Sequence, residues 1–353
     1  MTHPLLQRAR VEGTPLIDGE TATLVWRGPN PPHIIGDFND WERGLKPLKM
    51  KRAGPGVWAA KLELPRDTYM EYALVRGSRR VLDPFNLHKL WNGINAYNHF
   101  FYMPEAAPTP LAKRWRAVPH GTVTRHIVRA PFLVADGKRP VYLYQPPANA
   151  HEPCPLIVVY DGPDYLRRAQ LTTLVDNLIA QKRIRPVALA MIENGGPARF
   201  MEYACSESTL AFVLSQVVPL ARQHLNLIDP DQSPGAYGVL GASMGGLMAL
   251  YTGLRLSHIF GKVLAQSGAF SINTFDHVVY DLAQHGPLRP LEIWMNVGRY
   301  DMLELLAANR RMLEVLMNKG YRLTYREYNA GHNYPAWRDE VWRGLEALFS
   351  WNP

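Results

Sequence analysis

Short stretches of alternating apolar and polar residues fill the first hundred positions of the chain. Glycine, proline, asparagine and aspartate separate them, and they occupy residues 21–26, 33–38, 57–64, 69–75 and 79–85. Such spacing is typical of the strands of a small β-sandwich. We therefore predict an all-β domain over residues 1–103.

The pattern is then interrupted. Residues 104–121 carry four prolines and no periodic placement of apolar residues, which favours a linker over residues 104–120. Residues 122–132 and 139–145 look like a pair of strands that could start a second sheet, so we place the second domain at residues 121–353.

From Pro155 onward, apolar runs of strand length alternate with longer segments of helical period. Predicted strands cover 156–160, 187–192, 236–240, 262–267, 291–297 and 322–328, and predicted helices cover 167–183, 208–225, 244–254, 303–320 and 335–351. Strands that are apolar on both faces and alternate with helices indicate a mostly parallel sheet covered by helices. The second domain is therefore predicted to be α/β.

The most informative segment for chemistry is the GxSxG motif at residues 241–245, where a predicted strand runs into a predicted helix. A serine on such a sharp turn needs very small neighbours, which Gly241, Gly245 and Gly246 provide. The turn would expose the Ser243 hydroxyl above the carboxyl edge of the sheet. A purely structural glycine turn is the alternative, and the strand-turn-helix setting favours the nucleophile.

A serine nucleophile needs a base, and in folds of this kind an acid and then a histidine follow the serine along the chain. Asp301 follows the predicted strand 291–297, and His332 follows the strand 322–328. We predict a triad of Ser243, His332 and Asp301. Asp301 could instead cap the helix that begins near residue 303, with Glu304 as the fallback acid.

Backbone amides should hold the oxyanion that forms during acyl transfer. The amide of Met244 lies at the helix N-terminus next to the nucleophile. A second donor is expected in the loop YDGPDY, where Pro163 has no N–H. Asp161 or Gly162 is the expected donor, unless the loop presents Asp164 or Tyr165.

Composition and charge narrow the remaining classes of function. The net charge is +8, but no run of five or six like charges appears, so a nucleic-acid-binding stripe is not expected. There is no HExxH motif, CxxC pair, phosphate-binding GxxxxGK[ST] loop or dinucleotide-binding GxGxxG loop, so we expect neither a metal nor a cofactor. No apolar run approaches about 18 residues, and the N-terminus lacks a secretory pattern. We expect a cytoplasmic protein with no membrane span, with oligomers possible.

Residues from about 121 to the end resemble the esterase-D-like branch of the α/β-hydrolases, in particular enterochelin esterases and related feruloyl and acetyl esterases. The resemblance is carried in chain order by VVYDGPDY, PARFMEY, GASMGGLMALYTGL, VLAQSGAF, NVGRYDMLELLAANRRM and YNAGHNYPAWR. It implies an α/β-hydrolase fold, the triad Ser243, Asp301 and His332, and a role for the YDG loop in the oxyanion hole.

The first domain resembles immunoglobulin-like early-set modules grouped with glycogen-binding family 48. The resemblance rests on IIGDFNDWERGLKPLKM, GPGVWAAKLELPRDTYMEYALVRG and VLDPFN. Trp41 and Trp58 could stack on sugars or serve as core aromatics. The stretch 86–101, rich in asparagine and aromatic residues, could reach over the active site.

The resemblance implies ester hydrolysis of a small molecule, either anionic or aromatic. We expect a siderophore lactone, with feruloyl or acetyl esters as the alternative substrates. An acyltransferase is a further possible function for this fold. A glycan-binding protein without catalytic activity is the alternative from a different functional class. Asp164, Met244 and Asn333 depart from the enterochelin esterase pattern. Arg199 and Glu202 of RFMEY, together with Tyr165, are candidate substrate contacts, and a salt-bridged surface pair is the alternative for Arg199 and Glu202.

Overall fold

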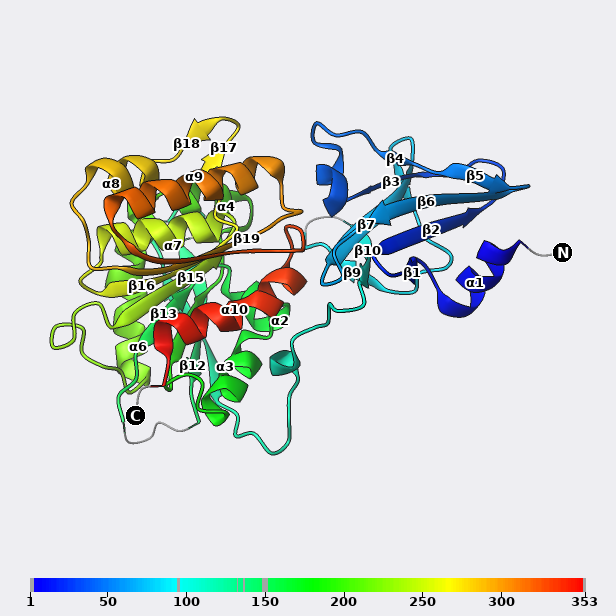
Figure 1. The fold of residues 1–353 in the computed structure, drawn as a ribbon. Helices are drawn as coiled ribbons and strands as arrows, with labels where there is room; N and C mark the ends of the chain where they lie inside the picture. The colour runs from blue at the N-terminus through cyan, green and yellow to red at the C-terminus, as the bar shows by residue number, and fades with distance from the viewer. Residues whose placement is uncertain (1–2, 94–95, 132, 136, 148–151, 352–353) are drawn as a thin grey trace. The chain divides into compact units, whose positions relative to one another are not determined.

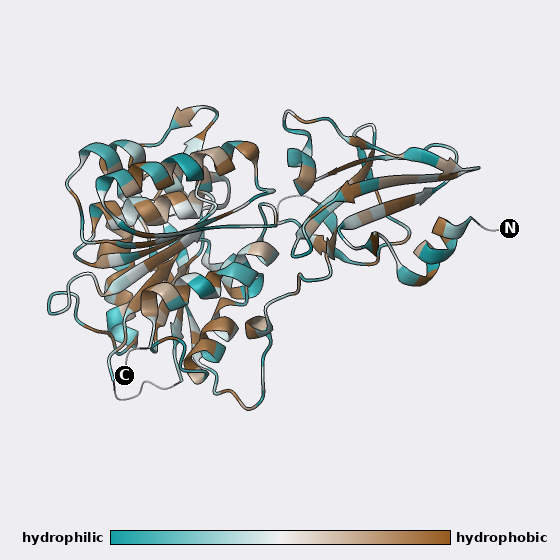
Figure 2. Cartoon of the chain, viewed as in Figure 1, coloured by the Kyte–Doolittle hydropathy of each residue, from teal (hydrophilic) through white to brown (hydrophobic). Residues whose placement is uncertain are grey.

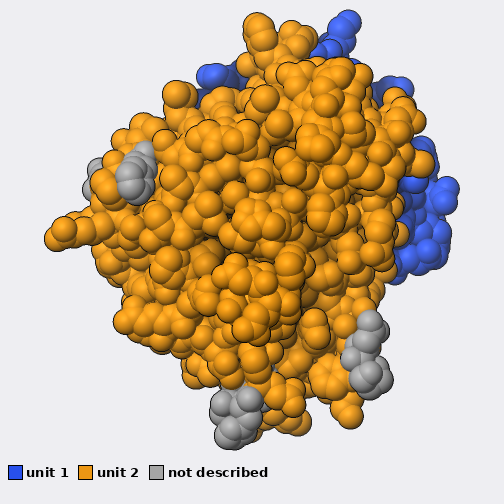
Figure 3. Space-filling view, turned by 90° about the vertical axis from the view of Figure 1, so that its left-hand side faces the viewer, with its two compact units in different colours: residues 1–107, 298–303, 327–336 blue, residues 108–297, 304–326, 337–353 orange. Residues whose placement is uncertain are grey.

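A computed structural model describes residues 3–93, 96–131, 133–135, 137–147 and 152–351 of the chain (Figure 1). The chain divides into two compact units, which are coloured separately in Figure 3. The first unit contains residues 1–107, 298–303 and 327–336, and the second contains residues 108–297, 304–326 and 337–353. The division therefore differs from the predicted domains, because two segments of the second half belong to the first unit.

Two antiparallel sheets make up most of the first unit. One has the order β1 (Leu16–Asp18), β2 (Thr21–Arg27), β6 (Val57–Glu63) and β5 (Lys51–Gly54). The other has the order β4 (Leu48–Lys49), β3 (His33–Gly36), β7 (Tyr69–Arg76), β10 (Tyr97–Tyr102) and β9 (Lys89–Trp91), with β8 (Arg79–Val81) paired to β7. Helix α1 (Pro4–Glu12) precedes the strands, and the short helix η1 (Asp37–Glu42) follows β3.

The sheets of the first unit share one hydrophobic core, as in a sandwich. Leu24 of β2 belongs to the same buried cluster as Tyr72 of β7 and Phe101 of β10. A strand places alternate side chains on opposite faces, but burial here does not alternate: β2 is buried at four consecutive positions and β7 at seven. Half of the stretch 86–101 forms strands β9 and β10, and its residues 94–95 lie outside the described part of the chain.

The predicted linker is held against the second unit over much of its length. It contains the short helix η2 (Pro110–Ala112), in which Leu111 is buried. Asn177 donates hydrogen bonds to the carbonyls of Leu111 and Lys113, at 2.7 and 2.9 Å. The amide of Thr109 donates to Asp339 at 2.9 Å. Residues 109–113 are therefore an ordered part of this unit.

An eight-stranded, mostly parallel sheet organises the second unit, as predicted. Its order is β11 (Thr122–Arg129), β12 (Lys138–Gln145), β14 (Ala188–Ile192), β13 (Leu156–Val159), β15 (Tyr237–Ala242), β16 (Phe260–Gln266), β19 (Glu292–Gly298) and β20 (Arg322–Tyr328). Strands β11 and β12 pair antiparallel, as do β12 and β14, whereas the pairings from β14 through β19 are parallel. A small hairpin of β17 (Ser271–Ile272) and β18 (Phe275–Asp276) follows β16.

Helices cover both faces of this sheet, with α7 and α9 on one face and α3 and α10 on the other (Figure 1). They are α2 (Gly162–Arg167), α3 (Leu171–Ala180), η3 (Gly196–Ala198), α4 (Arg199–Tyr203), α5 (Glu207–Phe212), η4 (Val213–Val217), α6 (Val218–His224), α7 (Met244–Arg255), α8 (Val279–His285), α9 (Leu303–Lys319) and α10 (Tyr334–Phe349). Figure 2 shows hydrophobic residues concentrated in the central strands. Strands β13, β14 and β15 are buried at every position.

Two predicted helices are interrupted. The helix predicted over 167–183 begins only at Leu171, as α3, because Gln170 takes a left-handed conformation with φ 51°, and Arg167 is instead the last residue of α2. The helix predicted over 208–225 contains the π-helical turn η4. Pro219 follows that turn. Because proline has no N–H, it cannot continue the regular helical hydrogen bonds, and a π-helical turn accommodates this interruption.

Candidate active site

Ser243 lies at the sharp turn between β15 and α7, where the sequence predicts a nucleophile. Its backbone has φ 58° and ψ −124°, a conformation that is rare for a residue with a side chain. Strain of this kind concentrates at functional sites, where the surrounding structure enforces it. The turn therefore has the backbone geometry expected of a strained nucleophile.

The glycines around Ser243 are required by close backbone contacts. A Cβ on Gly241 would lie 2.2 Å from the carbonyl oxygen of Gly245, which leaves no space for a side chain. A Cβ on Gly246 would lie 3.0 Å from the carbonyl oxygen of Gln266 and 3.1 Å from the Cα of Gly268. These contacts let α7 pack directly on the strands, as the motif predicts.

Hydrogen bonds of the turn determine which amide is available near Ser243. The amide of Ser243 itself donates to the carbonyl of Gln266 at 2.9 Å. The amide of Met244 begins α7, so it has no acceptor within the helix. The carbonyl of Leu240, which would be its partner in a longer helix, accepts from Tyr160 at 2.9 Å. Met244 is thus the candidate donor at this helix N-terminus.

The loop after β13 offers one amide that is not committed to the loop's own hydrogen bonds. The amide of Asp161 donates to the hydroxyl of Tyr203 at 3.1 Å. The amides of Asp164 and Tyr165 both donate to the carbonyl of Asp161, at 3.0 and 3.2 Å. Pro163 has none. The geometry therefore disfavours Asp161, Asp164 and Tyr165 as oxyanion donors and leaves Gly162, the first residue of α2.

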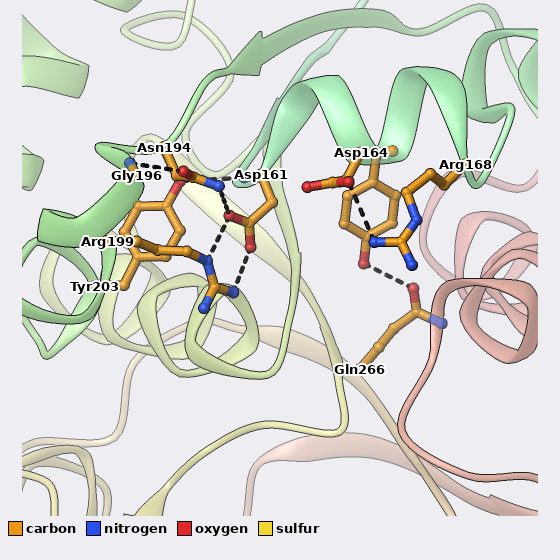
Figure 4. A network of polar contacts seen from close by, with 9 residues as sticks. Asp161, Asp164, Arg168, Asn194, Gly196, Arg199, Tyr203 and Gln266 are labelled. Carbon is orange, nitrogen blue, oxygen red and sulfur yellow. Dashed lines mark hydrogen bonds and ion pairs between the residues drawn. The ribbon is translucent and has the colours of Figure 1, made fainter. Parts of the chain in front are cut away.

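Asp161 shapes this loop from within. It adopts a left-handed conformation with φ 55°. Its carboxylate accepts two hydrogen bonds from the guanidinium of Arg199, at 2.7 and 2.6 Å, and a third from Asn194 at 2.7 Å (Figure 4). Its Oδ2 also lies close to the turn, 3.1 Å from where a Cβ on Gly245 would stand. The carboxylate therefore links the loop after β13 to the segment after β14 and lies beside the start of α7.

The structure brings together the predicted acid and base. His332 Nδ1 lies 2.8 Å from Asp301 Oδ1, and the Asp301 side chain is fully buried. Because the carboxylate accepts at Nδ1, the neutral imidazole carries its proton there, and Nε2 is the basic nitrogen. Asp301 Oδ1 also accepts from the amide of Met302 at 2.7 Å.

Two alternatives were open at this position: Glu304 as the acid of the triad, and a helix-capping role for Asp301. Glu304 accepts from the amide of Thr274 at 3.1 Å. The first amide of α9, that of Leu303, donates to Asp40 at 3.4 Å, so the cap considered as the alternative role of Asp301 comes partly from another residue. Ser243 belongs to the second unit, whereas Asp301 and His332 belong to the first unit.

Two of the predicted substrate contacts are disfavoured by their burial. Tyr165 is fully buried, its hydroxyl donates to Gln266 at 2.9 Å, and burial raises its pKa well above the usual value. Glu202 is also buried and pairs with Arg139 at 2.7 Å rather than with Arg199. Arg139 was missed by the sequence analysis because the pair joins positions 63 residues apart. Of the three predicted contacts, only Arg199 keeps an accessible side chain, which is 30% exposed.

The two tryptophans considered for sugar stacking both pack inside the first unit. Trp58 packs against the core cluster of the sandwich, and its indole N–H donates to the carbonyl of Gly28 at 2.9 Å. Trp41 packs against a smaller buried cluster and donates to Asp37 at 2.9 Å. These contacts favour the core interpretation of both residues.

Over the described ranges of the chain, no group of three or more histidine, cysteine, aspartate or glutamate side chains is arranged to hold a metal ion. In the same part of the chain, no single helix has the length and hydropathy of a membrane span. The bent pair Gly196–Tyr203 and Glu207–His224 meets those two criteria only when its helices are counted together.

Comparison with known proteins identifies a family. The family model described as "Putative esterase" matches residues 134–348. The iron(III) enterobactin esterase of Dickeya dadantii is 26% identical over 406 residues, covering 96% of this chain and 91% of the relative.

Solved structures show the same fold. The ferric enterobactin esterase of Salmonella typhimurium superposes with a TM-score of 0.78 at 21% identity, covering 93% of both chains. The ferulic acid esterase of the anaerobic fungus Anaeromyces mucronatus gives a TM-score of 0.57 at 15% identity and covers 68% of this chain and 95% of its own. The chain therefore belongs to this esterase family, and it is an esterase built on an α/β-hydrolase fold that follows an all-β region.

Proposed function

We propose that the protein is a serine carboxylic-ester hydrolase in which Ser243, His332 and Asp301 form a catalytic triad. His332 Nε2 takes the proton of the Ser243 hydroxyl while Ser243 Oγ attacks the ester carbonyl. The proton then passes to the departing alcohol, which leaves an acyl-enzyme. Water, activated by the same nitrogen, releases the acid and regenerates the serine.

The observation that carries this proposal is the hydrogen bond between His332 Nδ1 and Asp301 Oδ1. It fixes the tautomer that a general base requires and stabilises the imidazolium that forms. The strained turn at Ser243 and the chain order of serine, acid and histidine support the same assignment. Asp301 and His332 follow β19 and β20, two strands of the sheet that contains β15.

We further propose that the amides of Met244 and Gly162 hold the oxyanion. Both begin a helix, where backbone N–H groups have no helical acceptor and the helix dipole favours negative charge. Loss of one such donor in a serine hydrolase costs about 100- to 1,000-fold in turnover. Met244 has a bulky side chain, but the role requires only its backbone.

For the substrate we propose a siderophore lactone of the enterobactin type. The relative named as an iron(III) enterobactin esterase matches 96% of this chain and so includes the all-β region, whereas the ferulic acid esterase covers 68%. The net charge of +8 suits an anionic ligand. Feruloyl or acetyl esters are the second candidate class, because that esterase shares the α/β-hydrolase fold over 95% of its own length.

The proposal is tested in two steps. Purified protein should hydrolyse short p-nitrophenyl esters and react with a fluorescent phosphonate, and Ser243→Ala should lose both, with turnover reduced about a million-fold. Undiminished hydrolysis by Ser243→Ala would remove this serine from the mechanism. Turnover on ferric enterobactin is then compared with turnover on methyl ferulate, and a preference for ferulate would overturn the proposed substrate.

A further inference from the structure

The carboxyl group of Asp37 lies directly against the loop that carries His332. Asp37 begins η1, after β3, and is buried. A Cβ on Gly331 would stand 2.1 Å from Asp37 Cγ and 2.2 Å from its Oδ1, so the carboxyl occupies the place of a side chain at that position. A side chain at position 331 would therefore require the Asp37 carboxyl to move.

Asp37 also contacts the residue on the other side of the imidazole. The side-chain amide of Asn333 donates to Asp37 Oδ2 in a long hydrogen bond of 3.5 Å. The side-chain oxygen Oδ1 of Asn333 accepts from the amide of Ala336 at 3.0 Å, which fixes the Asn333 side chain at the start of α10. The Asp37 carboxyl group therefore contacts both Gly331 and Asn333, the residues on either side of His332 in the chain.

The same short helix reaches the loop that carries the acid. Asp40 Oδ2 accepts the amide of Leu303, two residues after Asp301. Asp40, Trp41 and Glu42 all have positive φ, at 50°, 52° and 67°. Three successive non-glycine residues in this region are strained, and strain maintained by the surrounding fold points to a function for the segment.

Asp37 is itself fixed by the sheet behind it. Its Oδ1 accepts from Trp41 Nε1 and its Oδ2 from the amide of Glu71, both at 2.9 Å. The Glu71 carboxylate accepts from Asn98 at 2.6 Å, and Asn98 accepts from Arg80 at 2.6 Å. Asp37 is therefore held by β7 and by its own segment η1, and the neighbouring Glu71 side chain is in turn held by residues of β8 and β10.

The pKa of Asp37 reflects the acidic groups near it. Burial, followed by the nearby Glu71 carboxylate, raises the pKa of Asp37 well above its ordinary value, and Asp301 adds to this shift. Burying a carboxyl group beside other acidic groups lowers the stability of the fold. A role in the site would explain why the position is occupied by an acid.

We propose that Asp37 is a positioning residue for His332: its carboxyl braces Gly331 and Asn333 so that the imidazole is held in register with Asp301. The inference rests on the proposed function, because it assigns the all-β module a part in forming the catalytic base. The module is then required for turnover of every ester substrate, including small ones that have no glycan or siderophore to be bound.

The test compares Asp37→Ala with Asp83→Ala in the full chain. Asp83 is a matched control: it is also buried in the first unit and accepts hydrogen bonds from Thr14, Tyr72 and the amide of Phe85. With a p-nitrophenyl ester, Asp37→Ala should lower kcat about 10- to 100-fold with KM within twofold, as expected for a misplaced base. Asp83→Ala should lower Tm but keep kcat within twofold at temperatures where both variants are folded.

Two further readouts do not depend on turnover. Hydrogen exchange over residues 329–336 should become faster in Asp37→Ala but not in Asp83→Ala, and the downfield proton resonance of His332 Nδ1–H should shift or disappear. If Asp37→Ala does not fold, Asp37→Asn and Asp83→Asn replace the pair. Unchanged exchange over 329–336, unchanged kcat in the Asp37 variant, or an equal loss in the Asp83 variant would overturn the inference. Wild-type protein without esterase activity would refute the proposed function, and hydrogen exchange would still decide whether Asp37 braces the loop.

Discussion

The guanidinium of Arg199 donates two hydrogen bonds to the carboxylate of Asp161, through Nε at 2.7 Å and through a terminal nitrogen at 2.6 Å. Asp161 precedes Gly162, the proposed oxyanion donor, so this pair fixes the loop from which that amide points. A planar guanidinium matches a carboxylate in a way that an ammonium group cannot.

Replacing Arg199 by lysine should therefore loosen the loop after β13. We expect Arg199→Lys to lower kcat on a neutral p-nitrophenyl ester about 10-fold, because a small displacement of a catalytic donor is expensive. Steady-state kinetics measure this. Arg168→Lys is the control, because Arg168 meets the partly exposed Asp164 in a longer contact, at 3.3 Å. A rise in KM for anionic substrates alone would instead place Arg199 in substrate binding.

Alanine at Gly241 should disrupt the nucleophile turn. Its Cβ would meet the backbone of Gly245 at 2.2 Å, so the start of α7 itself would have to shift. We expect a loss of about 1–3 kcal/mol of unfolding free energy or more, together with loss of labelling by a fluorescent phosphonate. Gly320→Ala provides the comparison: its φ is +90° but nothing lies within 4 Å of its Cβ, so labelling should persist. Normal labelling of Gly241→Ala would contradict the tight turn.

The buried pair of Arg139 and Glu202 should be sensitive to removal of one partner. Their side chains are 5% and 3% exposed, so Arg139→Met would leave a carboxylate buried without its counterion. Such a loss costs about 3–5 kcal/mol, whereas replacing both partners by apolar residues is often nearly neutral. Urea unfolding of Arg139→Met and of Arg139→Met/Glu202→Met tests this. Arg66→Met, which breaks an exposed pair with Glu105, should cost about 1 kcal/mol or less.

Acid should destabilise the first unit through His99. Burial lowers the pKa of His99 below its usual value, and its Nε2 accepts the amide of Asp83 at 3.0 Å, which requires the neutral ring. Because the folded-state pKa is depressed, the unfolded chain takes up the proton first. The stability is therefore complete above about pH 6.5 and is lost as the pH falls through the folded-state pKa. Thermal unfolding between about pH 8 and about pH 5 should show a weaker dependence in His99→Gln, and identical slopes would exclude this residue as the cause.

Local patterns predicted the elements and the order of the proposed triad, because strand period, glycine placement and chain order are properties of neighbouring residues. Contacts between distant positions were not predictable. Arg199 and Glu202 looked like partners because they lie three residues apart, but each pairs with an acid or base far away along the chain. The unit to which a loop belongs is likewise decided by packing, as the membership of residues 298–303 and 327–336 shows.

Asp37 and Gly331 are separated by almost the whole chain, and a glycine next to a histidine gave no sign of the carboxyl group that lies against it. Trp41, the tryptophan of the same segment, was a candidate for sugar stacking. Its indole instead donates to Asp37. The signal that could have found this contact is the acid-rich turn Asp37–Asp40, which has more polar groups than an exposed reversal of the chain needs.

Residues 298–303 and 327–336 group with the all-β region although strands of the other unit flank them. An α/β-hydrolase portion cut free at residue 108 would keep Ser243 but would expose the inner surface of the segments that carry Asp301 and His332. If the all-β module were exchanged for that of a distant esterase, the residue placed at position 37 would have to fit against Gly331. The two positions would therefore have to be changed together.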